Sequence, residues 1–165
     1  MAAPMKKRRS SGDQAARVGR ETPKLAWIPI VVIGMLTIGM GLAFALLRPG
    51  VVLLPEDQRY TGLTPEQLEV LDPELFSWIG MVFRSWGAFG IGLGLMITGL
   101  GAYGYRRGEL WAERLLFVAG LCTFSIFLTV NVLLRSDFAL VIGGLFVTFL
   151  AALVCGYWAR RRWAA

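Results

Sequence analysis

Four long apolar runs divide the chain, and short polar segments separate them. The runs cover residues 25–47, 77–105, 115–134 and 138–158. Each contains about 20 residues or more, which at about 1.5 Å per helical residue is enough to cross a hydrocarbon core about 30 Å thick. Helices buried in soluble proteins are seldom so long and so free of charge. The pattern therefore predicts an all-α fold, an integral membrane four-helix bundle.

The N-terminal segment differs from the rest of the chain. Residues 1–21 are polar and show no apolar periodicity, so we expect a disordered, basic cytoplasmic tail. Residues 22–163 are then a single transmembrane domain, in which Thr22 and Pro23 are suited to cap the first helix. Pro29 would cost a hydrogen bond inside a helix, so we expect either a kink there or a later helix start.

The one sizeable polar loop, residues 48–72, contains a helix-start signature. In "LTPEQL", Thr64 is suited to the N-cap, Pro65 to the first helical position and Gln67 to a capping box. We expect a short interfacial helix over 65–71, although an active-site lid is the alternative for such a loop. Further expectations are a cap by Asp72 on a helix that begins at Pro73, and two hydrophobic staples. The staple pairs are Leu63 with Leu68 and Leu71 with Phe76.

The basic residues are distributed unequally between the two sides of the predicted spans. Of the 17 Lys and Arg residues, 13 lie on one side if the N-terminus is cytoplasmic. Because Lys and Arg near span ends set orientation, both termini are predicted to be cytoplasmic. The basic tail is expected to contact anionic lipid and not nucleic acid. The 13 residues are Lys6, Lys7, Arg8, Arg9, Arg17, Arg20, Lys24, Arg106, Arg107, Arg114, Arg160, Arg161 and Arg162.

Small residues repeat every three or four positions along the second predicted span. They include Gly87, Gly90, Gly94 and Gly101, of which Gly90 and Gly94 form a GxxxG pair. Such pairs let a second helix approach closely, so these glycines are predicted to form a helix-packing face. The other spans also carry stripes of small residues, which predicts a compact bundle. These stripes are Thr37, Gly41 and Ala45; Cys122, Ser125 and Thr129; and Thr148, Ala152 and Cys155.

Arg84 lies at the head of the glycine face. Counting back about 20 residues from the end of the span puts the membrane boundary near residue 85, so Arg84 is expected at the interface. Trp78 and Trp86 flank it as predicted interface anchors. Three interpretations are open: an arginine that extends to the interface without a specific partner, a staple in an outer polar cluster with Asn131 and Asp137, or a contact for substrate or ion.

The residues that ion coupling, haem or metal binding and disulfide frameworks usually require are missing from this sequence or lie in unsuitable positions. No Asp, Glu, Lys or His lies near a span centre, where proton pumps and ion-coupled transporters usually carry one. The chain contains no His, which argues against bis-His haem and His-based metal sites. Cys122 and Cys155 lie in different spans, so they suggest neither a disulfide framework nor a zinc site. We therefore expect no enzymatic activity, no cofactor and no metal.

The second span and the turn after it resemble a known family. The stretch "SWGAFGIGLGLMITGLGAYGYRRGELWAERL" is similar to the glycine-rich second span, basic turn and third-helix start of small DoxX-like bacterial membrane proteins. The resemblance covers residues 25–160 and implies four spans with both termini inside. DoxX-like proteins often carry a glutamate before the glycine run, where this chain has Arg84, Ser85 and Trp86. No functional residue is therefore carried over from the family.

These observations support two principal hypotheses of function. The first is a small, non-enzymatic accessory or interaction subunit of the plasma (inner) membrane. Its expected partners are membrane lipids and other membrane subunits or a second copy, but no nucleic acid. The alternative is a lipid- or quinone-handling membrane protein with an outer-leaflet site near Arg84. A third class, a solute transporter, would need oligomerisation because four small helices enclose little cavity.

Overall fold

Helices joined by short turns and loops make up the described part of the chain. The computed structural model describes residues 25–48 and 51–164. Four of its helices are long and apolar enough to cross a membrane, which confirms the all-α, four-span fold class and makes this a multi-pass membrane protein. The long helices are α2 (Trp27–Leu46), α5 (Pro73–Gly99), α6 (Leu110–Leu133) and α7 (Ala139–Ala164), and the short helices α3 (Pro55–Thr61) and α4 (Pro65–Leu71) lie between α2 and α5 along the chain.

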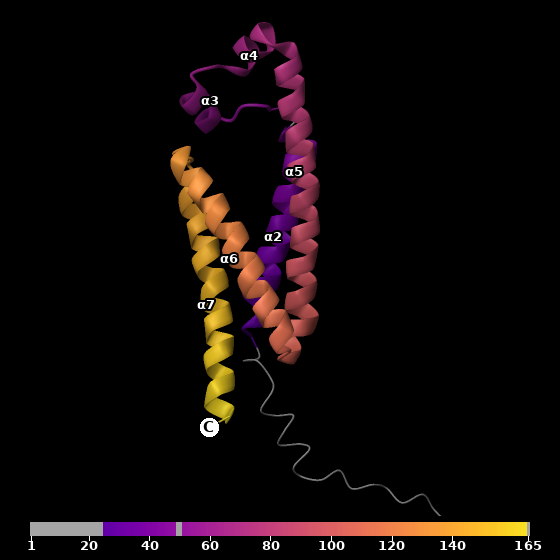
Figure 1. The fold of residues 1–165 in the computed structure, drawn as a ribbon, viewed down its shortest axis with the longest axis vertical. Coiled ribbons are helices and arrows are strands. Elements are labelled where there is room, and N and C mark those ends of the chain that lie inside the picture. The colour runs from indigo at the N-terminus through magenta and orange to yellow at the C-terminus, as the bar shows by residue number, and fades with distance from the viewer. Residues whose placement is uncertain (1–24, 49–50, 165) are drawn as a thin grey trace, which may run out of the picture.

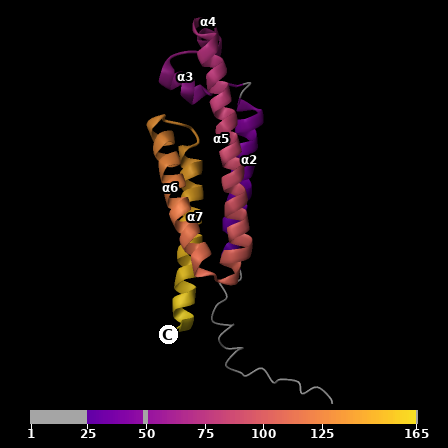
Figure 2. The same ribbon diagram turned by 45° about the vertical axis from the view of Figure 1, so that its right-hand side comes forward.

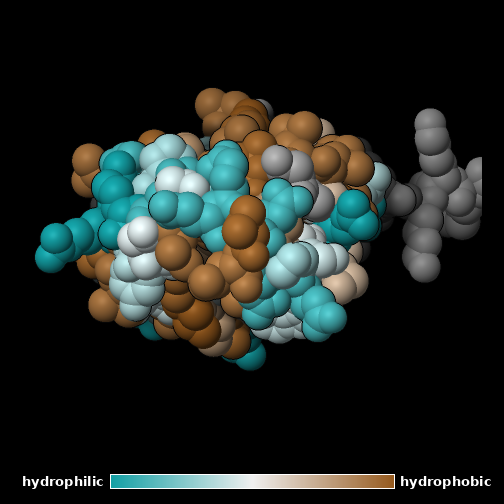
Figure 3. All heavy atoms as spheres, turned by 90° about the horizontal axis from the view of Figure 1, so that it is seen from above, coloured by the Kyte–Doolittle hydropathy of each residue, from teal (hydrophilic) through white to brown (hydrophobic). Residues whose placement is uncertain are grey.

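The long helices form two antiparallel pairs, α2 with α5 and α6 with α7 (Figure 1). The pairs lie close together at the end where α2 begins and α7 ends, which we call the terminal end. They diverge toward the opposite end, which α3 and α4 cover and which we call the capped end (Figure 2). Seen from the capped end, polar residues spread across the surface, with apolar residues around and between them (Figure 3).

Direct backbone contact holds α2 against α5. The glycines of the predicted packing face all point toward α2, namely Gly87, Gly90, Gly94 and Gly101. A Cβ atom added to Gly87 would meet the backbone of Ala45 and Gly41, and one added to Gly94 would lie 2.7 Å from the Gly34 carbonyl oxygen. Since only a hydrogen fits in these gaps, the two backbones approach as closely as small-residue motifs allow.

The second helix pair packs differently from the sequence-based expectation. Several residues of the stripes predicted to line the bundle are exposed, namely Cys122, Thr129, Thr148 and Cys155. The interior of this pair is instead aromatic. Gly120 of α6 leaves room for the ring of Phe149, which is fully buried and tilted against Phe124 at a centroid distance of 5.3 Å. The prediction of a small-residue contact face on every helix is therefore wrong for α6 and α7.

Tyr105 joins the two helix pairs at the terminal end. The α5 helix continues through a π-helical turn, Leu100–Gly104, and a 3-10 turn, Tyr105–Arg107. The Tyr105 side chain is fully buried, and its hydroxyl donates a hydrogen bond of 2.7 Å to the Ala152 carbonyl of α7. Gly156, on the same helix, lacks the side chain that would otherwise collide with this hydroxyl. The close end of the bundle is thus held by a polar contact between α5 and α7.

The first long helix begins later than its cap signal suggested. It starts at Trp27, so Pro29 occupies the third helical position, where a backbone N–H has no acceptor within the helix. The expected later start therefore accounts for this proline, and no kink is needed. The proposed cap at Thr22 and Pro23, like the tail 1–21, lies outside the described residues.

The capping signals in the loop predicted α4 correctly. The Thr64 hydroxyl accepts a hydrogen bond from Gln67 N, and the Gln67 side chain accepts one from Thr64 N. Asp72 then caps α5 by accepting a hydrogen bond of 2.9 Å from Leu75 N. Leu68 is buried against Val52 and Leu53, with Leu63 packed on the same cluster, whereas Leu71 is 73% exposed. Of the second predicted staple, Phe76 also packs on this cluster, while its partner Leu71 is mostly exposed.

Candidate functional site

The divergence of the two helix pairs leaves an apolar cleft below the capped end. Its larger part has a volume of about 660 Å³ and its smaller part about 460 Å³. Both parts are lined by Met40, Phe44, Trp86 and Phe127, so they form one continuous cleft. All four long helices contribute to its walls. Each volume lies within the range of about 300–1,000 Å³ that is typical of small-molecule sites.

The charged residues that line the cleft all lie at its capped end. They are Arg48, which lies two residues after the end of α2, and the consecutive acids Glu56 and Asp57 at the start of α3. Asn131 of α6 and Ser136 of the α6–α7 connection add uncharged polar groups nearby. The lining of the cleft is therefore amphipathic: its long walls are mostly apolar and its charged groups lie at one end.

Arg48 is the best-anchored charge at this end. Its side chain is 10% exposed, and Nη2 donates a hydrogen bond of 2.6 Å to Asp57 Oδ2. Nη1 donates to the carbonyl oxygens of Val51 and Val52, at 3.0 and 3.1 Å. The guanidinium lies 4.2 Å from the centroid of the Phe83 ring, which is a cation–π geometry. Arg48 thereby connects α5 with the segment that precedes α3.

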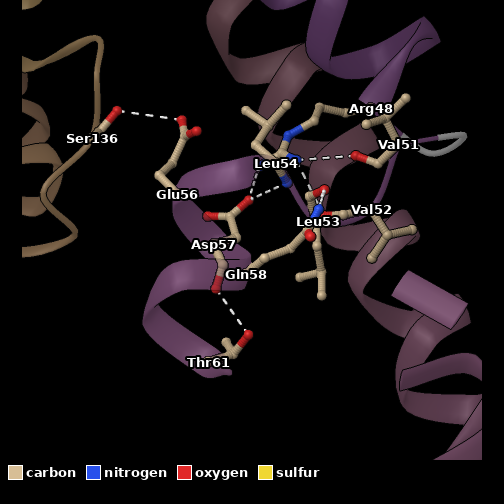
Figure 4. Close-up of polar contacts among 10 residues, drawn as sticks. All are labelled: Arg48, Val51, Val52, Leu53, Leu54, Glu56, Asp57, Gln58, Thr61 and Ser136. Carbon is tan, nitrogen blue, oxygen red and sulfur yellow. Dashed lines mark hydrogen bonds and ion pairs between the residues drawn. The ribbon is translucent and has the colours of Figure 1, made fainter. Parts of the chain in front are cut away.

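The two acids at the start of α3 point in different directions (Figure 4). Asp57 faces Arg48 and also accepts a hydrogen bond of 2.9 Å from Leu54 N, which caps α3. Glu56 faces the other helix pair, where the Ser136 hydroxyl donates to its Oε1 at 3.3 Å. Both Glu56 and Ser136 are buried. Because α3 contacts both pairs, it forms a roof over the cleft.

A tight turn brings the α6–α7 connection to this roof. Arg135 adopts a left-handed conformation with φ of 51°, and Ser136 N donates to the Asn131 carbonyl oxygen at 2.9 Å. This closes the end of α6 and directs the next residues toward α3. Asp137 then pairs with Arg59 of α3 at 3.1 Å, in an ion pair whose side chains are 52% and 71% exposed for Arg59 and Asp137.

The predicted outer polar cluster is not assembled. Arg84 is exposed and makes no hydrogen bond or ion pair with any residue in the described ranges. Asp137 pairs with Arg59, while Asn131 Nδ2 donates to the Phe127 carbonyl of its own helix. The stripe that Arg84 heads faces α2, as the contact of Gly87 with Ala45 shows. Asn131 and Asp137 lie on α6 and in the α6–α7 connection, which belong to the other helix pair.

One of the two predicted interface anchors, Trp86, lies at the cleft. Trp78 and Trp86 are 57% and 52% exposed, and Trp86 also lines the cleft, with its ring centroid 6.4 Å from that of Phe127. Their role as interface anchors stays a prediction. The main polar groups of the cleft were not predicted as site residues, namely Arg48, Glu56, Asp57 and Ser136.

Metal ligands do not gather at the cleft. Within residues 25–48 and 51–164, no three His, Cys, Asp or Glu side chains are grouped as a metal site would require. Cys122 and Cys155 are free thiols on exposed faces of α6 and α7. The cleft offers apolar walls with carboxylate and amide oxygens at one end.

No family model matches the chain, and no curated protein or solved structure matches it significantly. The resemblance to DoxX-like proteins thus rests on the sequence pattern alone.

Proposed function

We propose that this multi-pass membrane protein is a non-enzymatic lipid-binding protein that holds a hydrocarbon chain in the cleft between its two helix pairs. The observation that carries the proposal is the cleft itself, which has mostly apolar walls from all four long helices and charged residues only near the roof formed by α3. A single amphiphile satisfies both parts, with its chain against the aromatic walls and its head near Glu56.

Hydrocarbon is the natural content of such a cleft. Cavities lined by apolar side chains stay dry, because a water molecule inside them would lack hydrogen-bond partners. Membrane lipid chains are as apolar as the cleft walls, so contact with hydrocarbon alone gives little preference for one lipid over another. Any selectivity therefore comes from the shape of the cleft and from the polar groups at its capped end.

The proposal includes an orientation. We place the protein in a plasma (inner) membrane with both termini in the cytoplasm, so that α3 and α4 lie outside and the cleft opens into the outer leaflet. The distribution of Lys and Arg supports this orientation. The position of the start of α2 and the end of α7 at the same end of the bundle is consistent with it (Figure 1).

Cysteine-accessibility labelling tests the orientation. In a variant whose Cys122 and Cys155 are replaced by Ala, single cysteines are introduced at Gly108 or Thr61. A membrane-impermeant maleimide should label position 61 in intact cells and position 108 only after the membrane is opened. Positions 10 and 165 should behave like position 108. External labelling at position 108 would overturn the proposed topology.

Filling the cleft tests the lipid-binding proposal. Ala43 lines the cleft, whereas Ala88 is exposed on α5 and is not among the residues that line it. We expect Ala43→Phe to lose lipid that the wild-type protein retains in mild detergent, because the ring occupies the volume of the chain. Ala88→Phe, a matched control, should retain it. Native mass spectrometry counts the retained lipids, and equal retention in all three proteins would contradict the proposal.

The accessory-subunit hypothesis has its own supporting observation. Gly144, Thr148 and Cys155 form an exposed row of small residues on α7, and the space beside Gly144 is open within 4 Å. Such a row suits close approach of a helix from another membrane protein. A larger complex in mild detergent that Gly144→Leu disperses would favour this function. A lone species that carries lipid would favour the lipid-binding proposal.

A further inference from the structure

We infer that the lipid held in the cleft carries a primary ammonium group, which donates hydrogen bonds to the carboxylate of Glu56. The inference rests on the proposed lipid-binding function and specifies the chemical class of its ligand. Two observations at the capped end support it. Most hydrogen-bond donors there are used within the protein while acceptors are open, and one negative charge has no ion-pair partner among the described residues.

Most side-chain donor groups at the polar end of the cleft already have an acceptor in the protein. The Ser136 hydroxyl donates to Glu56, and Asn131 Nδ2 donates to the Phe127 carbonyl. Arg48 donates through both terminal nitrogens, and its Nε, although without an acceptor, is inaccessible. A ligand head that only accepts hydrogen bonds, such as a quinone carbonyl, would find few free donors here.

The acceptors, in contrast, are open. The Glu56 side chain is buried at 5% exposure, yet its carboxylate accepts only one hydrogen bond from the described residues, the 3.3 Å bond from Ser136. A carboxylate can accept about four hydrogen bonds in all. The side-chain oxygen of Asn131, which also lines the cleft, accepts none from these residues. Because a buried carboxylate without enough donors is costly, this site favours a ligand that donates.

The charges select among donating heads. Arg48 is paired with Asp57 and Arg59 with Asp137, so the formal charges of each pair cancel. Glu56 has no ion-pair partner in the described part of the chain and leaves one formal negative charge at the end of the cleft. An ammonium group supplies three donors and a positive charge, whereas a hydroxyl supplies one donor and no charge. An anionic head group would face Glu56 with like charge.

Photo-cross-linking with three matched probes tests the head group. The probes are octadecylamine, octadecanol and octadecanoic acid, each with the same diazirine in the chain, added to the purified full-length protein. Cross-links are mapped to cleft peptides by mass spectrometry. We expect the amine to label the cleft on the order of tenfold more than the acid, as a charge-assisted hydrogen bond allows, with the alcohol between them.

Variants assign the preference to Glu56. Glu56→Gln should remove the advantage of the amine over the alcohol, while Glu69→Gln, which alters an exposed acid of α4, should leave it unchanged. Ser136→Ala serves as a second variant in case Glu56→Gln does not fold. It removes the one hydrogen bond that Glu56 accepts, so the preference for the amine should increase.

The outcomes separate this inference from the function on which it rests. Equal labelling of the cleft by all three probes would overturn the ammonium head group and leave the lipid-binding function in place. If the amine and the alcohol label the cleft equally and the acid labels it less, the role of the positive charge would be overturned. Labelling that avoids every cleft residue would overturn the proposed function itself.

Discussion

Replacing Asp57 with Asn is expected to destabilise the fold by about 3–5 kcal/mol, because it leaves the buried positive charge of Arg48 without its partner. The side chains of this pair are 10% and 18% exposed, and their 2.6 Å contact is the one ion pair of Arg48 among the described residues. Asparagine keeps an oxygen that can accept the hydrogen bond from Leu54 N, so the cap of α3 is retained. The substitution therefore isolates the loss of charge.

The second ion pair of α3 provides the matched control. Arg59 and Asp137 are largely exposed, and exposed pairs contribute about 0–1 kcal/mol. Thermal unfolding in detergent should show a large decrease in Tm for Asp57→Asn and little change for Asp137→Asn. Adding Arg48→Met to Asp57→Asn should recover part of the loss, because it removes the unpaired charge. Equal decreases for the two single variants would show that burial does not decide the contribution of these pairs.

The four spans and α4 could be predicted because their signals are local. Span length follows from the apolar runs, and the start of α4 follows from a Thr-Pro-x-Gln sequence whose two reciprocal hydrogen bonds form between residues three apart. The cap by Asp72 is equally local. In each of these cases the interaction that defines the element lies within the segment that carries its sequence signal.

The α3 helix lacked such a complete signal. Its N-cap is Leu54, a residue that has no side-chain acceptor for the backbone N–H groups of the first turn. The remaining signs were Pro55 at the first position and Asp57 at the third, which accepts the hydrogen bond from Leu54 N. An acid three residues after an apolar N-cap, with proline between them, is a weak signal that could have identified α3.

The polar end of the cleft depends on contacts across long sequence distances. Arg48 is held where it is because α3 folds back so that Asp57 reaches it. Glu56 meets Ser136 across 80 residues of sequence. The staple interpretation of Arg84 failed for a related reason, since the stripe that Arg84 heads faces α2 while Asn131 and Asp137 lie on the other helix pair. Periodicity along one helix does not define which neighbour its face will meet.

The packing of α2 against α5 gives the second large expected effect. Gly87→Ala should destabilise the protein, because the usual cost of overpacking, about 1–3 kcal/mol, exceeds the gain of roughly 0.5–1 kcal/mol from replacing glycine within a helix. The added Cβ would meet backbone atoms of Ala45 and Gly41, which cannot rotate away as a side chain can. Relief therefore requires the whole of α2 to shift, and this shift would also alter the cleft walls at Phe44 and Met40.

Gly92→Ala is the control that makes this result specific. Gly92 lies on the same helix, five residues along, and a Cβ atom there would meet nothing within 4 Å. Both substitutions favour the helix over the unfolded chain by roughly 0.5–1 kcal/mol, since alanine has less backbone freedom than glycine. In thermal aggregation assays in detergent, Gly87→Ala should therefore aggregate at a lower temperature than the wild-type protein, and Gly92→Ala at an equal or higher one. Equal aggregation temperatures for the two variants would mean that α2 is not held by this contact, and the cleft between the helix pairs would then lose the rigid wall on which lipid binding depends.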